Sequence, residues 1–461
     1  MFIENIRDTI AAVTTGSGKS PVGIVRLSGP QALSIVDKIF VSKKGIKPSA
    51  FKTYTFHYGS IVYDARALDE VLVSVMRAPF SYTREDVVEI NCHGGLLPLK
   101  NVLDAVLASG CRMASPGEFT RRAFLNGRID LAQAEAVAGV IEAKTESALK
   151  ISLSQLKGGL SKELGRISRF LTDCLVVLEA QIDFPEEDTG SRDRPNIDKE
   201  LSSALFGINK LLEGAGAGLM LREGVSAVIC GRPNVGKSSL LNALLKKERA
   251  IVTSVAGTTR DSIEEVVDIK GIPVKIMDTA GILEPRDLIE KKAVSRTRAH
   301  IRSADLVIVL FDAGRRLTKE DRLIMRRLRM KDNVIAVINK IDLRQQIDGG
   351  AIRKAFPRVV EISARKMKNI GFLEEAIYDF VYQGKSADSE SVLVTSMRHV
   401  EELRKAQGFI AAASSGLSER LSAELLAQDL KDAVSCLDRI LGRDSSASVL
   451  DRIFSDFCIG K

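Results

Sequence analysis

A phosphate-binding loop inside the chain constrains its fold more than any other feature. Residues 231–238 read GRPNVGKS and fit the pattern GxxxxGK(S/T). They follow the apolar run 225–230 and precede a helical pattern at 239–245, which is the context that this motif requires. Glycines let the backbone wrap around phosphates, Lys237 can neutralise the charge of the β- and γ-phosphates, and Ser238 can ligate Mg²⁺. The segment therefore predicts a nucleoside triphosphate site.

Three further motifs stand at the ends of predicted strands. In residues 339–342 (NKID), a carboxylate at Asp342 can accept hydrogen bonds from both N1–H and the exocyclic amine of guanine, a donor pair that adenine lacks. Residues 278–281 (DTAG) suit water-mediated Mg²⁺ binding and sensing of the γ-phosphate, and residues 363–365 (SAR) can supply backbone contacts to the base. The four motifs in this order resemble the GTPase superfamily of the TRAFAC class.

That resemblance extends to the first switch segment, residues 257–261 (GTTRD), and implies that Thr259 is the second Mg²⁺ ligand beside Ser238. The residues expected to contact GTP lie in or directly beside the four motifs, in this switch segment and in residues 253–256 just before it. They are Asn234, Val235, Gly236, Lys237, Ser238, Ser239, Thr253, Ser254, Val255, Ala256, Gly257, Thr258, Thr259, Asp278, Thr279, Ala280, Gly281, Asn339, Lys340, Asp342, Ser363, Ala364 and Arg365.

The hydrolytic machinery is incomplete by comparison with Ras-like enzymes. Ile282 follows the DTAG motif where those enzymes carry the glutamine that orients the attacking water, and an isoleucine cannot do so. Glu290, twelve residues after Asp278, is the candidate to replace it, although it could also be a solvated helix residue. The expected catalytic residues are Glu290, Lys237 and Asn234.

The rest of the chain predicts a multidomain protein that combines α+β and α/β parts. Residues 1–122 alternate β-rich runs with turns and brief helices, as an α+β domain does. Residues 123–222 form a first helical half, in which an apolar stripe from 149 to 182 predicts one long helix. Residues 223–384 predict a GTPase domain with a doubly wound parallel sheet, and residues 385–461 predict a second helical half. Because neither half has a partner within itself, we expect them to pair around an inserted GTPase domain.

Composition sets limits on function. The chain of 461 residues contains no apolar run near ~20 residues, so no membrane contact is expected. Its first residues carry acids and do not form a secretory signal, which predicts a cytoplasmic location. The six cysteines lie far apart and indicate reduced thiols. A net charge of +8 is compatible with a nucleic-acid partner but is small for this length.

Over its whole length the chain resembles the MnmE (TrmE) family of tRNA modification GTPases. The matching segments are 80–90 (FSYTREDVVEI), 93–95 (HGG), 116–119 (PGEF), 123–136 (AFLNGRIDLAQAEA) and the last residues 457–461 (FCIGK). The resemblance implies a homodimer that joins an FAD-dependent protein, MnmG, in a heterotetramer or larger complex. It also implies that the two proteins add an aminomethyl or carboxymethylaminomethyl group to C5 of wobble uridine 34 in certain tRNAs.

Two bound groups follow from the same resemblance. K⁺, held by Asn234, Thr253, Val255 and Thr258, replaces an arginine finger when two GTPase domains meet. The N-terminal domain, which also dimerises, binds 5-formyl- or 5,10-methylene-tetrahydrofolate through Arg26, Glu89, Arg128 and Lys461. A carboxylate suits the amino-pterin edge and cations suit the glutamate tail. Each of these charges could also be solvated. The chain departs from the family pattern at Arg84, where glycine is common, and at Arg128, where lysine is common.

Other readings remain open. A ribosome-assembly GTPase of the Era/Der type shares the GTTRD segment, but carries an RNA-binding domain or a second GTPase module after the first. A folate-dependent one-carbon enzyme with a regulatory GTPase is a third class. His93 could be catalytic or structural, Cys458 reactive or merely buried, and the helical stripe of Lys319, Arg322 and Arg326 could touch RNA or face solvent.

Overall fold

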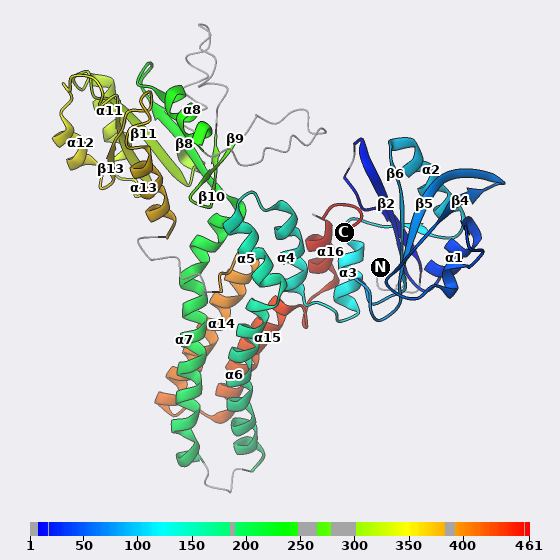
Figure 1. The fold of residues 1–461 in the computed structure, drawn as a ribbon. Helices are drawn as coiled ribbons and strands as arrows, with labels where there is room; N and C mark the ends of the chain where they lie inside the picture. Colours follow the sequence, from blue (N-terminus) through cyan, green and yellow to red (C-terminus); the bar gives the residue numbers. More distant parts are fainter. Residues whose placement is uncertain are drawn as a thin grey trace. The chain divides into compact units, whose positions relative to one another are not determined.

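The computed structural model describes residues 8–16, 18–184, 190–247, 265–277, 301–382, 392–455 and 457–461 (Figure 1). The chain divides into two compact units, Met1–Ala138 with Leu437–Lys461, and Gly139–Cys436. The first contains an α+β part, and the second contains long helices and an α/β part. The predicted fold class, α+β and α/β with a helical domain, is confirmed.

A seven-stranded sheet with the order β3-β4-β5-β6-β2-β1-β7 forms the centre of the first unit. Its strands are β1 (Ile10–Val13), β2 (Ser20–Ser28), β3 (Phe40–Ser42), β4 (Thr55–Tyr63), β5 (Arg66–Met76), β6 (Val87–Gly94) and β7 (Arg112–Met113). Helices α1 (Ala32–Ile39) and α2 (Leu96–Ala108) bury one face of this sheet together with the short 3₁₀ helix Pro48–Ala50. The β-rich runs and the helical pattern that the sequence predicts here lie in β2, β5, β6 and α2. The shorter or more polar strands were not predicted.

A second group of apolar residues lies on the other face of β1 and β2. Ile10 and Ala12 pack there with Phe119 of α3 (Glu118–Leu125). The beginning of α4 (Leu131–Glu142) packs with α16 (Ala447–Ser455) through Leu131, Phe454 and neighbouring residues. Because of this packing, the end of the chain returns to α3: the backbone N–H of Phe119 donates to the carbonyl of Lys461 at 3.1 Å.

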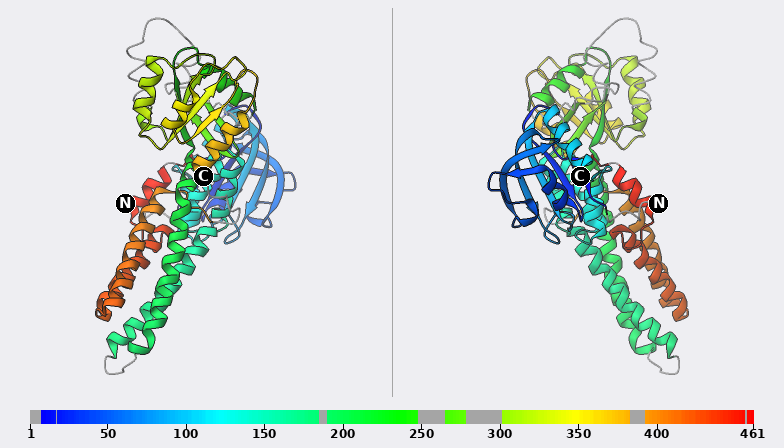
Figure 2. Two further views of the ribbon diagram at one scale, coloured as in Figure 1. Left: turned by 90° about the vertical axis from the view of Figure 1, so that its left-hand side faces the viewer. Right: turned by 90° about the vertical axis from the view of Figure 1, so that its right-hand side faces the viewer.

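Five long helices belong mainly to the second unit: α5 (Glu146–Leu156), α6 (Gly159–Asp183), α7 (Gly190–Glu223), α14 (Met397–Glu419) and α15 (Ala423–Leu441). α7 packs along both α6 and α14 (Figures 1 and 2). The apolar stripe expected as one helix is divided between α5 and α6. Gly158 interrupts it with a left-handed φ of 82°, which glycine adopts without steric cost.

A six-stranded sheet with the order β13-β12-β11-β8-β10-β9 completes the second unit. It contains β8 (Val225–Gly231), β9 (Glu265–Ile269), β10 (Ile272–Ile276), β11 (Leu306–Asp312), β12 (Val334–Asn339) and β13 (Val359–Glu361). Helices α8 (Lys237–Lys247), α11 (Lys319–Leu328), α12 (Gly349–Ala355) and α13 (Ile370–Tyr382) accompany it, and separate apolar cores lie on its two faces. The sheet is therefore doubly wound.

One strand of this sheet differs from the expected parallel arrangement. β9 is antiparallel to β10, and the two are joined at Lys270 and Gly271, which have φ angles of 52° and 85°. Two consecutive residues with positive φ are typical of a tight hairpin turn, so the edge strand is a local hairpin and not a crossover. Within the described ranges, no helix has the length and hydropathy needed to cross a membrane.

Candidate functional site

The phosphate-binding loop connects the end of β8 to the start of α8. Gly231, Asn234 and Gly236 have positive φ angles of 144°, 63° and 102°, which curl the backbone between the strand and the helix. At Gly236 a Cβ atom would lie only 2.2 Å from the side-chain nitrogen of Asn339, and φ is 102°, so a larger residue would be strained there and would displace Asn339. A curled loop before a helix N-terminus presents backbone N–H groups and a positive dipole end, which together bind phosphates.

Lys237, the first residue of α8, lies against this loop. Its Nζ donates hydrogen bonds to the carbonyls of Gly231 (3.1 Å) and Arg232 (2.9 Å). Burial lowers the pKa of Lys237, because it disfavours the charged ammonium. A triphosphate bound at the loop would supply the negative charge that favours the protonated form. Ser238 follows in the first turn of α8, as a Mg²⁺ ligand at this position requires.

Asn339, at the end of β12, links the phosphate loop to the predicted base-binding segments. Only 2% of its surface is exposed. Its amide nitrogen donates to the carbonyl of Val235 at 2.9 Å, and its oxygen accepts the backbone N–H of Ala364 at 3.0 Å. Because β8, β12 and β13 are parallel or linked through parallel neighbours, their carboxyl ends meet at one edge of the sheet.

Asp342 occupies the place expected for guanine recognition. Its Oδ1 accepts a hydrogen bond from the hydroxyl of Ser363 at 2.5 Å, and this bond lowers the pKa of the Asp342 carboxyl. The carboxylate therefore stays ionised as an acceptor. Lys340 lies beside it with a φ of 69°, and its Nζ donates to the carbonyl of Asn234 and to Asp312, both at 2.7 Å. The side chains of Asn339 and Lys340 thus both connect the base-binding segment to the phosphate-binding loop.

The structure brings together the described members of the predicted GTP site. They are Asn234, Val235, Gly236, Lys237, Ser238, Ser239, Asn339, Lys340, Asp342, Ser363, Ala364 and Arg365. The other predicted contacts, Thr253 to Thr259 and Asp278 to Gly281, lie outside the described residues, as do Ile282 and the catalytic candidate Glu290. Of the predicted K⁺ ligands, Asn234 alone falls within the described ranges, and it is exposed.

A second site lies in the first unit, on the sheet face away from α1 and α2. Arg26 of β2 and Glu89 of β6 are direct cross-strand neighbours, and their side chains form an ion pair at 2.8 Å. Alternate residues of a strand point to opposite faces, and Val25 and Leu27 contribute to the core beneath α1 and α2. The ion pair therefore faces the side on which α3 packs.

Two aromatic rings connect this ion pair to the other predicted residues. The guanidinium carbon of Arg26 lies 5.6 Å from the ring centre of Phe119 and 6.0 Å from that of Tyr82. Arg128 lies over the same Tyr82 ring at 4.7 Å, and Phe119 binds the carbonyl of Lys461. Arg26, Glu89, Arg128 and Lys461, which are far apart in the sequence, are thus linked through Tyr82 and Phe119: the two arginines lie by the rings, Glu89 pairs with Arg26, and the backbone of Lys461 contacts Phe119. Two guanidiniums, a carboxylate and aromatic rings can bind a flat heterocycle with an anionic tail.

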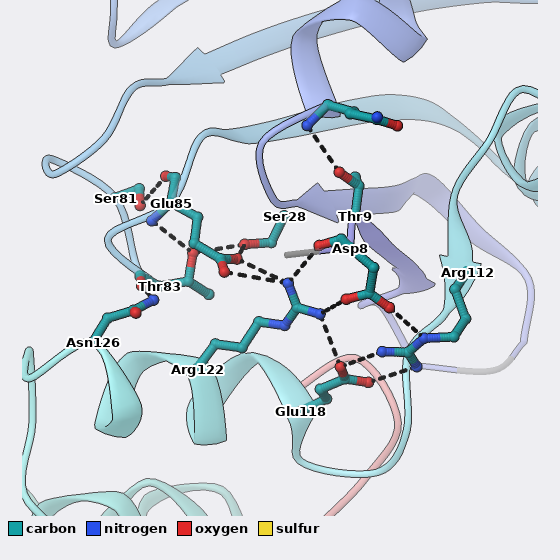
Figure 3. A network of polar contacts seen from close by, with 11 residues as sticks. Asp8, Thr9, Ser28, Ser81, Thr83, Glu85, Arg112, Glu118, Arg122 and Asn126 are labelled. Carbon is teal, nitrogen blue, oxygen red and sulfur yellow. Dashed lines mark hydrogen bonds and ion pairs between the residues drawn. The ribbon is translucent and has the colours of Figure 1, made fainter. Parts of the chain in front are cut away.

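A buried ionic network lies beside these rings (Figure 3). Arg122 of α3 is 3% exposed, and its guanidinium lies between three carboxylates: Asp8 at 2.5 Å, Glu118 at 3.0 Å and Glu85 at 3.2 Å. Arg112 pairs with Asp8 at 2.7 Å and with Glu118 at 2.6 Å. The network joins the start of β1, the turn at 83–86 and α3. Neither the network nor Tyr82 was predicted from the sequence. The only signal was that Tyr82, Glu85, Glu118 and Arg122 lie in or beside the segments of family resemblance, whereas Asp8 and Arg112 do not.

The turn at 83–86 is attached to the end of α3 as well. The amide of Asn126 donates to the carbonyl of Thr83 at 2.7 Å, and Arg84 donates to the carbonyl of Asn126 at 2.9 Å. Arg84 has a φ of 60°, which explains why glycine suits this position better. These contacts hold the segment that carries Tyr82 against the segment that carries Arg128.

Two further candidates have different surroundings. The ring of His93 is 70% exposed, and its Nδ1 lies 2.6 Å from Asp69, whose other oxygen accepts the His93 backbone N–H at 2.8 Å. Cys458 is exposed, in contrast to the other five cysteines, so its interpretation as a buried hydrophobe is wrong. Burial raises the pKa of the Cys92 thiol, next to His93, to about 11.

Comparison with solved structures finds similarity to part of this chain. The G domain of the T. maritima FeoB iron transporter is 29% identical, with 34% of this chain and 98% of that one covered, and a TM-score of 0.26. Era in complex with nucleotides of 16S ribosomal RNA is 28% identical, with 40% and 66% covered and a TM-score of 0.28. These values are too low to carry an argument about the whole chain.

Families and curated relatives give a full-length match. Residues 131–458 match the family described as the MnmE helical domain, and residues 9–128 match the N-terminus of the GTP-binding protein TrmE. The chain is similar to the tRNA modification GTPase MnmE of Alkaliphilus oremlandii, at 45% identity over 99% of this chain and 100% of the relative. It is 43% identical to that of Clostridioides difficile, with 100% of both covered. The chain belongs to the MnmE family of tRNA modification GTPases.

Proposed function

We propose that the protein uses GTP hydrolysis to drive the modification of wobble uridine 34 in tRNA. With an FAD-dependent partner it would add an aminomethyl or carboxymethylaminomethyl group at C5, acting as a homodimer in the cytoplasm. The observation that carries this proposal is the meeting of Arg26, Glu89, Arg128 and Lys461 around Tyr82 and Phe119. Such a site fits a reduced folate, which can supply one carbon.

The charges in this site suit the two ends of a folate. The Glu89 carboxylate can accept hydrogen bonds from the amino-pterin edge of a folate, and it forms an ion pair with Arg26 at 2.8 Å. The guanidinium of Arg128 is available for the glutamate tail. A bound folate would supply the one-carbon unit, and the side chains would orient its ring on Tyr82. Calorimetry with 5-formyl-tetrahydrofolate tests the site, and no heat of binding at millimolar ligand would remove this part of the proposal.

The reaction itself is tested by mass spectrometry of tRNA nucleosides from cells that lack this chain. Loss of the C5 modifications at position 34, restored by the wild-type chain, is the expected result. The Lys237→Ala variant should fail to restore them, because it removes the lysine held in the phosphate loop. Unaltered wobble nucleosides in the deletion strain would contradict the proposal and favour a ribosome-assembly or a one-carbon role.

The GTPase cycle is proposed to depend on K⁺ and on a second copy of the chain. Support comes from Asn234, which is exposed on the phosphate loop, and from Ile282, which leaves the attacking water without an orienting side chain. Hydrolysis should accelerate when K⁺ replaces Na⁺. Glu290→Ala should abolish turnover and retain GTP affinity. Equal rates in both salts, or turnover by the variant, would show that another group completes the site.

The Era/Der alternative has no comparable support. An RNA-binding domain or second GTPase module would follow the first GTPase domain in such a protein. Instead, residues 392–455 and 457–461 form α14, α15, α16 and a short tail. We therefore retain the tRNA modification role.

A further inference from the structure

One segment of the GTPase part carries most of the excess positive charge of the protein. Residues 315–331 contain eight cations, Arg315, Arg316, Lys319, Arg322, Arg326, Arg327, Arg329 and Lys331, and two acids, Glu320 and Asp321. The segment therefore has a net charge of +6 in a chain whose total is +8. It comprises α11 and the residues at its two ends. In the rest of the chain the cations exceed the acids by only two, so this segment is a strong local source of positive charge.

The two acids of α11 are engaged elsewhere. Asp321 forms the capping box with Thr318, accepting from the Thr318 N–H at 2.9 Å and from its hydroxyl at 2.8 Å. Glu320 accepts from Arg232 of the phosphate-binding loop at 2.9 Å, and Arg232 also lies 3.4 Å from Asp321. Neither carboxylate forms an ion pair with a cation of α11 itself. The same contacts attach the start of α11 to the phosphate-binding loop.

The outer face of α11 presents its cations to solvent. Asp321, Met325 and Leu328 form the buried side, which leaves Lys319, Arg322 and Arg326 exposed on the opposite side at spacings of three and four. None of these three forms an ion pair with any described residue. Like charges at such spacings repel, and Lys319 and Arg322 also lie near the positive end of the helix dipole. The arrangement destabilises the isolated helix, so a bound polyanion would relieve it.

A cleft of about 520 Å³ adjoins this stripe, between α11 and the start of α12. Arg316 and Arg322 line it together with the apolar side chains of Met325 and Ile347 and the amide of Gln346. Asp348, the N-cap of α12, also lines the cleft, and its carboxylate accepts the backbone N–H of Ala351 at 3.1 Å. The two guanidiniums outnumber this carboxylate, so phosphates would bind on the side of the cleft that α11 forms. The surface comprising Arg316, Lys319, Arg322, Arg326 and Arg327 is called the α11 basic surface below.

We propose that the α11 basic surface binds the phosphate backbone of the tRNA substrate. Guanidinium groups match phosphate oxygens with two parallel hydrogen bonds, and four of the five cations are arginines. The surface contains no aromatic side chain for base stacking, so its contribution is electrostatic and independent of sequence. The choice of RNA over an acidic protein rests on the tRNA modification role proposed above. Bound tRNA would contact a helix that is attached to the phosphate-binding loop through Arg232.

The test compares two charge-matched variants of the full chain in binding to an unmodified tRNA transcript across a salt series. Arg322→Gln with Arg326→Gln removes two cations of the surface. Lys162→Gln with Arg169→Gln removes two exposed cations of α6. Each lost phosphate contact lowers the slope of log affinity against log salt by about 0.7 to 0.9. The α11 variant should therefore lose about 1.4 to 1.8 of slope and bind roughly 30-fold more weakly at 0.1 M salt. The α6 variant should match the wild type.

Both variants should hydrolyse GTP without RNA at the wild-type rate, which verifies their folding. An unchanged affinity and slope in the α11 variant would overturn the inference, and so would an equal loss in the α6 variant. Absence of salt-dependent tRNA binding by the wild-type chain would also overturn it. The wider function is judged separately by the nucleosides of the deletion strain: normal modification there would refute the function, whatever the binding result.

Discussion

Asn339 donates a hydrogen bond to the backbone carbonyl of Val235 at 2.9 Å, and thereby joins the base-recognition motif to the phosphate-binding loop. The same side chain accepts the N–H of Ala364 at 3.0 Å. Gly236 passes so close to it that a Cβ there would lie 2.2 Å from the amide. One buried side chain therefore sets the distance between the two ends of a bound nucleotide.

Replacing Asn339 by alanine should weaken GTP binding at both ends of the nucleotide. The change leaves the Val235 carbonyl and the Ala364 N–H without partners, at about 1–3 kcal/mol each. We expect affinity to fall by roughly tenfold or more, measured by titration with a fluorescent GTP analogue. Asn333→Ala is the control, because Asn333 binds the carbonyls of Ala304 and Asp305 at the opposite edge of the sheet. Equal losses of affinity in both variants would show a general loss of stability instead.

Asp342→Asn should change the base preference. The two carboxylate oxygens can accept hydrogen bonds from both N1–H and the exocyclic amine of guanine. An amide oxygen can accept from only one of these groups, and the amide NH₂ then faces the other donor. GTP should bind roughly 100-fold more weakly, since the amide loses a charge-assisted hydrogen bond to the base. Xanthosine triphosphate, which carries a carbonyl in place of the amine, should bind better. Asp348→Asn, which changes the N-cap of α12 and lies outside the predicted GTP contacts, is the control. An unchanged ratio of the two affinities would place base recognition elsewhere.

Two variants of Tyr82 separate its ring from its hydroxyl. The ring lies 6.0 Å from the guanidinium of Arg26 and 4.7 Å from that of Arg128, and the hydroxyl forms a 2.9 Å hydrogen bond with Thr120. Tyr82→Phe keeps the ring and should retain binding of 5-formyl-tetrahydrofolate. Tyr82→Leu removes the aromatic face and should weaken binding by roughly tenfold, corresponding to about 1–2 kcal/mol of cation–π and stacking energy. Calorimetry measures both, and equal affinities would exclude the ring from the site.

Arg122→Gln should strongly destabilise the first unit. The change leaves Asp8, Glu85 and Glu118 near one another with only Arg112 to neutralise them, and breaking a buried ion network costs about 3–5 kcal/mol. Hydrogen exchange of peptides from α3, followed by mass spectrometry, should accelerate. Arg443→Gln disrupts an exposed pair with Asp438 and should cost less than about 1 kcal/mol. Equal protection of α3 in wild type and Arg122→Gln would contradict a stabilising role for the network.

The same network predicts a pH dependence. Burial alone would raise the pKa of Asp8 and of Glu118, but hydrogen bonds and charges from Arg112 and Arg122 outweigh this effect. The pKa of Asp8 therefore lies below its ordinary value of 3.8, and that of Glu118 lies below its ordinary value of 4.5. The unfolded chain therefore binds protons before the folded one as the pH falls. The stabilisation is complete when the pH is above the pKa values of these carboxyls in the unfolded chain. It is lost as the pH falls towards their lower pKa values in the folded protein. Protection of α3 should be constant from pH 7 to about 5 and decline below about 4.5. In Arg122→Gln this decline should be smaller; an identical decline would assign it to other carboxylates.

Some of this architecture can be predicted because its constraints are local. The loop 231–238 requires a strand before it and a helix after it, and β8 and α8 occupy those places. Buried parallel strands are continuous apolar runs, so β11 and β12 were predicted nearly to their ends. The break between α5 and α6 was not predicted, since the apolar spacing continues across Gly158 and only its backbone angle shows the interruption.

The nucleotide motifs, their order and the family can be predicted from the amino-acid sequence, because each depends on residues that are adjacent in the chain. The surroundings of Arg122 could not be predicted in this way, because its partners Asp8 and Glu85 are 114 and 37 residues away. A lone arginine in a helical pattern predicts a solvated charge. It becomes a buried centre of three carboxylates only when a strand, a turn and a helix meet, and no local pattern encodes that meeting.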